Sequence, residues 1–236
     1  MTNELFQFKQ FSVDHHGCAM KVGTDGVLLG CWSRIDGAST ILDIGTGCGL
    51  IALMVAQRTP PGARITGVEI LETDAEVART NVANSPWPEK ITIHNVAVQD
   101  FNPDEKFDLI VSNPPFFVNS FRPPDLNRMS ARHTHALSFP DLLHSVDRLL
   151  TAEGKLSIIL PAVEGTIFRE AALEFGLHCS RLWRFRPRIG KPVERLLMEF
   201  CRRKADPETG EIVMYADGNE WTDGFKELSR EFYLKI

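Results

Sequence analysis

The chain has 236 residues, of which 43% are hydrophobic and 24% are charged, and its net charge is −5. This length is enough for one large globular core, and the acidic balance does not favour nucleic-acid binding unless basic residues gather locally. The N-terminal sequence MTNELFQFKQ lacks the basic start and apolar run of a secretion signal, and no apolar segment reaches the roughly 18 residues of a membrane span. We therefore expect a cytoplasmic protein with no membrane association and no obligate protein partner.

Five cysteines lie at positions 18, 31, 48, 179 and 201 and form no Cys-x-x-Cys pair. Their odd number and their spacing argue against a disulfide framework, so we interpret them as reduced thiols. His15, His16 and Cys18 are close enough in sequence to suggest a metal, but a structural metal site would normally need a second pair of ligands. Solvated or buried side chains explain these three residues better, and no metal is expected.

The first 38 residues form an N-terminal extension that contains the glycine-punctuated stretch KVGTDGVLLG. From Ser39 onward, strand-like apolar runs alternate with helix-like segments. Strands are expected at 39–45, 63–70, 91–98, 107–113 and 155–162, and helices at 50–58, 73–85 and 139–150. This alternation is typical of an α/β, Rossmann-like fold in which a mostly parallel sheet carries helices on both faces.

The C-terminal part of the chain departs from this alternation. Beyond Glu164 come one more helix pattern and two long extended runs, LHCSRLWRFRPR and VERLLMEFCRRK, which we expect to pair antiparallel across the intervening IGKP. The core domain is therefore assigned to residues 39–205. Residues 206–236 follow the turn signal DPETGE and are expected to pack on the core through residues at helical spacing: Trp221, Phe225, Leu228 and Phe232.

A glycine-rich loop follows the first predicted strand of the core. The sequence DIGTGCG, Asp43 to Gly49, leads directly into a helix pattern. Glycines permit a tight turn and a close approach of the backbone to a ligand, and the helix start offers unpaired amides. Glu69 ends the second strand 26 residues after Asp43, where a carboxylate suits the two hydroxyls of a ribose. Together the two features predict a nucleoside-containing cofactor.

The glycine spacing also separates classes of cofactor. Dinucleotide enzymes use G-x-G-x-x-G, whereas this loop reads G-x-G-x-G and is preceded by Asp43. An acidic residue beside the loop would repel a pyrophosphate but suits a cationic ligand. S-adenosylmethionine carries both a sulfonium and an ammonium group, so it is the cofactor that the loop favours.

Polar side chains follow four successive predicted strands at their carboxyl ends: Asp43, Glu69, Asp100 and Asn113. Each of them alone is more simply explained as a cap or turn residue. In open α/β sheets, however, ligands bind at the carboxyl ends of the strands. Four such residues on one rim therefore favour a binding site over four unrelated turns.

The fourth strand runs into the tetrad Asn113, Pro114, Pro115 and Phe116. An exocyclic amine of a nucleobase is a poor nucleophile because its lone pair is delocalised into the ring. The Asn113 side-chain oxygen and the Pro114 carbonyl can accept its two hydrogens, and Phe116 can stack on the base. Pro115 restricts the acceptor backbone, so little reorganisation accompanies the reaction. The alternative is a simple turn that ends the strand.

These motifs resemble those of the amino-methylating class I S-adenosylmethionine-dependent methyltransferases. The sequences FKQFSVDHHGCAMKVGTDGVLLGCW, NPPFF, ARH at Ala131 to His133 and WTDGFKELSREFYL further resemble the bacterial tRNA(Val) (adenine-N6)-methyltransferase family. That family modifies the adenine 3′ of the anticodon. The similarity extends over nearly the whole chain, although DHHGC stands where a more ordinary polar stretch is expected, which leaves the function of that loop open.

The resemblance implies a set of site residues. Asp43, Gly45 and Gly47 would line the cofactor site, and Glu69 would hold the ribose hydroxyls. Asp100, with Phe101 beside it, would meet the adenine of the cofactor. Residues near the methionine end would be Thr24 and Asp25, and the catalytic tetrad would be Asn113, Pro114, Pro115 and Phe116.

A basic surface is expected in the segment from Arg181 to Lys204, which has nine Lys or Arg and two Glu and a net charge of +7. In a strand, Arg184, Arg186 and Arg188 would share one face, opposite Trp183 and Phe185. We expect these arginines, with Lys191 in the following turn, to contact tRNA phosphates. The alternative is an edge strand protected from aggregation by its charges.

Three other functions remain to be compared with tRNA adenine methylation. An rRNA guanine-N2 methyltransferase uses the same kind of tetrad on another base. A nucleotide-linked oxidoreductase is disfavoured by the glycine spacing. A non-catalytic RNA-binding module that retains the cofactor fold is disfavoured by the intact tetrad.

Overall fold

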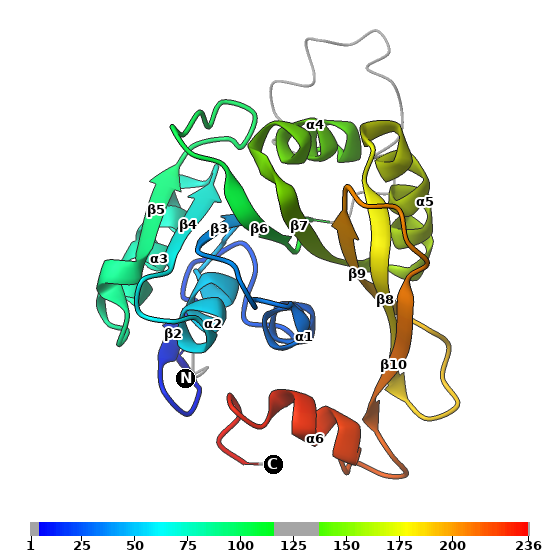
Figure 1. Cartoon of the computed structure of the whole chain (residues 1–236). Coiled ribbons are helices and arrows are strands. Elements are labelled where there is room, and N and C mark those ends of the chain that lie inside the picture. The colour runs from blue at the N-terminus through cyan, green and yellow to red at the C-terminus, as the bar shows by residue number, and fades with distance from the viewer. Residues whose placement is uncertain (1–4, 116–136, 236) are drawn as a thin grey trace, which may run out of the picture.

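The computed structural model describes residues 5–115 and 137–235 and shows an eight-stranded mixed sheet with helices on both faces (Figure 1). The strand order is β10-β8-β9-β7-β6-β3-β4-β5. This arrangement confirms the predicted α/β, Rossmann-like fold. The strands are β3 (Thr40–Ile44), β4 (Arg64–Glu69), β5 (Ile91–Asn95), β6 (Phe107–Ser112), β7 (Leu150–Pro161), β8 (His178–Arg188), β9 (Arg195–Cys201) and β10 (Glu208–Tyr215).

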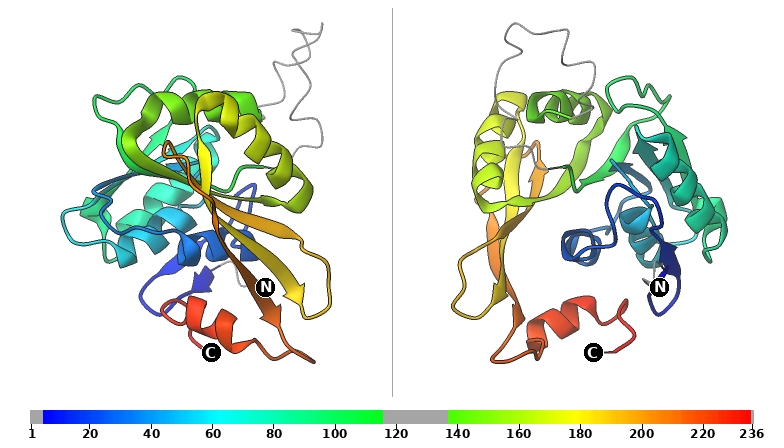
Figure 2. Two further views of the ribbon diagram at one scale, coloured as in Figure 1. Left: turned by 45° about the vertical axis from the view of Figure 1, so that its right-hand side comes forward. Right: turned by 180° about the vertical axis from the view of Figure 1, so that it is seen from behind.

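Helices form two layers, one on each face of the sheet. One apolar cluster joins α1 (Thr24–Trp32), α2 (Leu50–Arg58), α3 (Glu72–Ala83) and α6 (Asp223–Ser229). A second cluster joins α4 (Phe139–Leu149), α5 (Ala162–Ala172) and the sheet's other face. Figure 2 shows α4 and α5 at the opposite end of the molecule from α6. Short 3₁₀ turns lie at η1 (Pro88–Lys90) and η3 (Leu173–Phe175), and no helix of the described stretches is long and apolar enough to cross a membrane.

Strand direction decides which side chains meet at one edge of the sheet. Strands β5, β4, β3, β6 and β7 run parallel, while β9 is antiparallel to both β7 and β8. The predicted antiparallel pairing of the two long C-terminal runs is therefore confirmed. Because β8 runs in the direction of β7, its C-terminal end and the start of β9 at Arg195 lie at the same edge as the ends of β3, β4 and β6.

The last strand, β10, was not predicted from the sequence. It pairs in parallel with β8 from Glu208 onward. Only the first two residues of the DPETGE stretch therefore precede the strand, and the other four belong to it. Gly210 lies in this strand, and the Trp183 side chain packs directly over it, which leaves no room for a larger residue. A Cβ atom there would come within 2.3 Å of the indole, and a glycine within a strand marks such a close approach.

The two ends of the chain pack against each other. The hairpin of β1 (Leu5–Gln7) and β2 (Ser12–Asp14) is joined to the C-terminal segment where the Lys9 amide donates to the Phe232 carbonyl at 2.8 Å. Of the four residues in the predicted apolar stripe, Phe225 and Phe232 are almost completely buried, whereas Trp221 and Leu228 are partly buried. Helix α6 is shorter than that stripe, because Trp221 precedes it and Phe232 follows it.

Candidate active site

A cavity of about 870 Å³ opens at the edge where the parallel strands end. Its lining residues are drawn from segments 19–26, 44–51, 68–74, 96–99 and 113–115, together with Leu137 and Arg195. The volume lies near the top of the range for small-molecule sites and leaves room for a cofactor with one nucleobase. The predicted residues that line it are Thr24, Asp25, Gly45, Gly47, Glu69, Asn113, Pro114 and Pro115.

The glycine-rich loop forms the floor of this cavity. Gly45 and Gly47 have φ values of 70° and 53°, a region that favours glycine, and a Cβ atom on either would meet no heavy atom within 4 Å. The backbone is thus exposed to the space in which a ligand would lie. The next glycine, Gly49, caps the start of α2 with φ at 83°, so the loop passes directly into that helix.

Glu69 lies at the end of β4, and both of its carboxylate oxygens accept backbone hydrogen bonds. One oxygen accepts from the Gly47 amide at 3.0 Å, and the other accepts from the Leu71 amide at 2.9 Å. The carboxylate therefore holds the glycine loop in place from the neighbouring strand. Each oxygen has a second lone pair, which can accept from a ligand hydroxyl.

Asp43 lies beneath the loop and does not line the cavity. It is completely buried, and its Oδ2 atom accepts from the Thr46 hydroxyl at 2.7 Å and from the Ala52 amide at 3.2 Å. Its Oδ1 atom is buried without a hydrogen-bond partner in the described part of the chain. Burial raises the pKa of this carboxyl to about 7. The side chain thus fixes the loop to the start of α2.

The N-terminal extension supplies one wall of the cavity. Gly26 and Gly30 lie one helical turn apart in α1, and Cβ atoms there would come within 2.9 Å of Leu50 and 2.6 Å of Met54 in α2. This close packing brings the first turn of α1, with Thr24 and Asp25, to the cavity. The glycine punctuation of KVGTDGVLLG therefore reflects helix packing.

The charged lining residues that were not predicted from the sequence include Arg195 and Asp74. The Arg195 Nε atom donates to the Asp25 carboxylate at 2.8 Å, which joins β9 to α1 across the opening. Asp74 in α3 accepts from the Ala19 amide at 3.2 Å and is nearly completely buried. Both residues lie in ordinary strand or helix patterns, so the sequence offered no local signal for them.

Asn113 comes directly after β6, at the centre of the rim. Its side-chain Oδ1 atom is buried and has no hydrogen-bond partner within the described residues. Such an atom is rare in folded proteins, and it often marks a place that a ligand or water satisfies. Pro114 is buried and Pro115 is exposed, and both line the cavity. Phe116 lies outside the described residues.

Asp100 and Phe101 do not line the cavity in this structure. Asp100 is exposed and lies five residues beyond the end of β5. The Phe101 ring packs in the core, with its centroid 5.3 Å from that of His94. Val98 and Gln99, which directly precede them, form the corresponding part of the wall.

The predicted basic residues divide into two groups. Arg186 donates to Glu211 of β10 at 2.5 Å, and Arg188 donates to the Ala216 carbonyl at 3.2 Å and to that of Gly218. The other two, Arg184 and Lys191, are exposed and make no side-chain hydrogen bond or ion pair within the described residues. The expected alternation holds, since Phe185 is buried on the face opposite the arginines.

The loop before α1 is held by a histidine. His15 is buried, and its Nδ1 atom accepts from the Val22 amide at 3.4 Å. Burial raises the pKa of the nearby Cys18 thiol to about 12, which keeps it protonated. In the part of the chain that the structure describes, no group of three or more His, Cys, Asp or Glu residues could hold a metal ion.

Comparison with known sequences relates the chain to methyltransferases. The family model of the methyltransferase small domain matches residues 22–163. The tRNA1(Val) (adenine(37)-N6)-methyltransferase of Bacteroides thetaiotaomicron is 45% identical over 100% of both chains. The protein of the same name from Aeromonas hydrophila is 43% identical over 99% of both.

Solved structures with the same fold are also methyltransferases. A predicted O-methyltransferase from Agrobacterium tumefaciens has a TM-score of 0.68 and 21% identity, over 88% of this chain and 96% of that one. A glycopeptide N-methyltransferase solved with S-adenosyl-L-methionine has a TM-score of 0.54 and 12% identity, over 76% and 95%. At these identities the likeness establishes the fold alone.

Proposed function

The chain belongs to the tRNA1(Val) (adenine(37)-N6)-methyltransferase family, and we propose on that basis that it methylates N6 of adenine 37 in tRNA1(Val). The methyl donor of this class of enzyme is S-adenosylmethionine. The reaction belongs in the cavity at the strand ends, because backbone amides, carboxylates and the Asn113 side chain converge there. We place the enzyme and its tRNA substrate in the cytoplasm.

The residues on one side of the cavity fit S-adenosylmethionine, which supplies an electrophilic methyl group on its sulfonium. The glycine loop exposes backbone that no Cβ atom covers, and Glu69 has free lone pairs for the ribose hydroxyls. The first turn of α1, at Thr24 and Asp25, lies where the methionine portion would extend. Ile70 and Val98 provide apolar surface for the adenine ring of the cofactor.

The observation that carries the proposal is the buried, unpartnered Oδ1 atom of Asn113. It can accept one hydrogen of the target N6 amine, and the Pro114 carbonyl can accept the other. Two acceptors draw the nitrogen lone pair out of conjugation with the ring and aim it at the methyl group. The nitrogen forms a bond to the methyl carbon as the carbon–sulfur bond breaks, and it then loses one proton to solvent. Phe116 is proposed to stack on the base.

The adenine must leave its stack to reach this site, so the protein must also hold the surrounding RNA. We propose that the turn between β8 and β9 does so, because it lies at the same edge of the sheet as the cavity. Arg184 in β8 and Lys191 in the turn are exposed cations that make no side-chain pair within the described residues. They are suited to phosphate contacts.

Methylation in vitro tests this function. Unmodified tRNA1(Val) is incubated with the protein and S-adenosylmethionine, digested to nucleosides and analysed by mass spectrometry. The expected product is N6-methyladenosine in amounts that approach one per tRNA. A parallel incubation contains rRNA fragments in place of the tRNA. Formation of N2-methylguanosine in the rRNA fragments, with no N6-methyladenosine in the tRNA, would instead support guanine methylation.

A further inference from the structure

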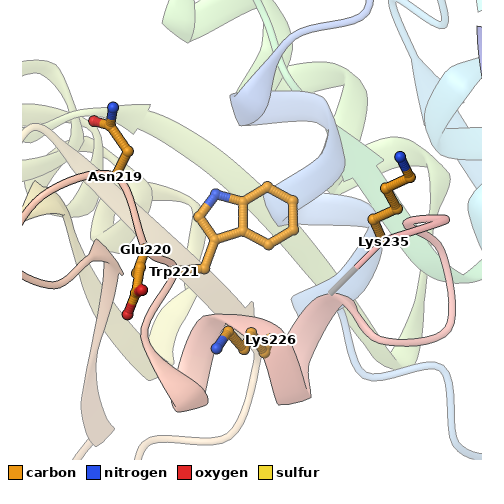
Figure 3. Close-up of a pocket in the computed structure, with 5 residues that line it drawn as sticks. All are labelled: Asn219, Glu220, Trp221, Lys226 and Lys235. Carbon is orange, nitrogen blue, oxygen red and sulfur yellow. The ribbon is translucent and has the colours of Figure 1, made fainter.

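A second hollow, of about 350 Å³, lies beside the start of α6 and outside the reaction cavity. Figure 3 shows the indole of Trp221 in its middle, with Asn219 and Glu220 on one side and Lys235 on the other. The ring is partly exposed and is held in place by Phe225 and Tyr233, whose centroids lie 5.1 and 5.0 Å from its own. A fixed, accessible aromatic surface thus faces the hollow.

Two lysines flank this ring. Lys235 is exposed and makes no side-chain hydrogen bond or ion pair within the described residues. Lys226 has a loose ion pair with Asp223 at 3.9 Å, and Asp223 is fully exposed. An ion pair of that kind contributes little, so the ammonium group can turn to another anion. The hollow thus combines an aromatic face with two available cations, which is the chemistry that binds an unstacked nucleotide.

The hollow is connected to the reaction cavity by a continuous edge of the sheet. Arg195 of β9 lines the cavity and pairs with Phe185 in the neighbouring strand β8. Three residues further along β8, Arg188 pairs with Tyr215 at the end of β10. The Arg188 guanidinium donates to the Asn219 side chain at 3.5 Å, and Asn219 lines the hollow. Strand spacing and residue rise place the hollow about 15 to 20 Å from Arg195.

We propose that the Trp221 hollow binds a second nucleotide of the same tRNA, a few positions from the methylated adenosine. This inference rests on the proposed function. The base stacks on the indole, the lysines contact the flanking phosphates, and Asn219 and Glu220 offer hydrogen-bond acceptors to the base edge. A few nucleotides of an extended single strand cover the distance between the two sites.

The two parts of this site leave different signatures in tRNA binding. Phosphate contacts release counterions, so Lys226→Gln with Lys235→Gln should lower the slope of log affinity against log salt by about 1.4 for two single-strand contacts. Stacking is not ionic, so Trp221→Leu should weaken binding roughly 5- to 100-fold with little change of slope. Both are measured by filter binding of unmodified tRNA1(Val) over a salt series.

The matched control is Lys106→Gln with Lys204→Gln. It makes the same change of charge at two exposed lysines, before β6 and after β9, which lie at the opposite edge of the sheet. Its salt slope should equal that of the parent protein. Affinity for S-adenosylmethionine should stay unchanged in all variants, and Trp221→Phe should restore binding because a phenyl ring also stacks.

Parallel salt slopes for the parent and the Lys226/Lys235 variant would overturn the inference. An equal loss of slope in the control would overturn it as well, since the effect would then be one of total charge. If the parent methylates tRNA while these slopes stay parallel, the proposed function stands and the Trp221 site fails. If the parent binds tRNA but methylates no adenine, the proposed function fails instead.

Discussion

Asn113 is the residue on which the chemistry depends most directly. Replacing it with Ala removes one acceptor of the amine but leaves the cofactor's part of the cavity intact. By analogy with the loss of one preorganised hydrogen bond in other enzymes, the rate of methyl transfer should fall about 10²- to 10³-fold. Single-turnover kinetics measure this rate, and calorimetry should show an unchanged affinity for S-adenosylmethionine. The control is Asn84→Ala, at an exposed position. A methyl-transfer rate of Asn113→Ala within twofold of the parent would show that the tetrad is a simple turn.

Glu69 has two functions at once, because it accepts amides from the loop and is proposed to accept ribose hydroxyls. Glu69→Ala should therefore weaken S-adenosylmethionine binding by about 1.5 to 3 kcal/mol, the range for hydrogen bonds to a charged acceptor. Calorimetry tests this, with Asp104→Ala at an exposed site as the control. An unchanged cofactor affinity would exclude Glu69 from the ribose site.

Asp43 should make stability depend on pH. Burial raises its folded-state pKa to about 7, whereas the unfolded value is about 3.9. The folded protein holds this proton more tightly, so the group's contribution to stability is full below about pH 4 and is lost as pH rises to about 7. Asp43→Asn keeps an acceptor for Thr46 and Ala52 and cannot titrate.

The parent should therefore lose free energy of unfolding relative to Asp43→Asn between pH 4 and 7, at up to about 1.4 kcal/mol per pH unit. Above about pH 8 the difference should be constant. Urea titrations at several pH values measure it. A difference that does not vary with pH would show that Asp43 titrates normally in the folded state.

At the scale of elements, the cations of the β8–β9 hairpin differ in whether an acidic side chain pairs with them. Arg186 is paired with Glu211, whereas Arg184 and Lys191 are unpaired within the described residues. Arg184→Gln with Lys191→Gln should lower the salt slope of tRNA binding by about 1.4 to 1.8, while Arg186→Gln should lower it less. Filter binding tests this, and a larger effect for Arg186→Gln would show that its ion pair opens to RNA.

The repeating strands and helices were predictable because buried parallel strands and their crossover helices have distinct apolar periods. β10 escaped prediction for a local reason. Its glycine is covered by Trp183, a contact with a residue 27 positions earlier that no sequence window contains. The position of Asp100 outside the cavity could not be predicted either. Its distance from the cavity depends on the path of the loop after β5 and not on its place in a motif.

At the scale of the whole molecule, the two terminal segments hold each other and shape the site. The N-terminal segment forms a wall of the cavity at Thr24 and Asp25, while the C-terminal segment contacts it through Phe232. Arg195 joins the late strand β9 to α1. None of these contacts could be predicted from spacing, because each joins residues that are far apart in the chain. The rim residues Glu69 and Asn113 were predictable because strand ends share one edge.

The most direct measurement is a map of N6-methyladenosine in tRNA1(Val) from cells that lack this protein and carry either the parent gene or Asn113→Ala. Adenine 37 should be unmethylated without the protein, methylated with the parent, and largely unmethylated with the variant at equal protein level. Full methylation of adenine 37 in the absence of the protein, or equal methylation by the parent and by Asn113→Ala, would contradict the account.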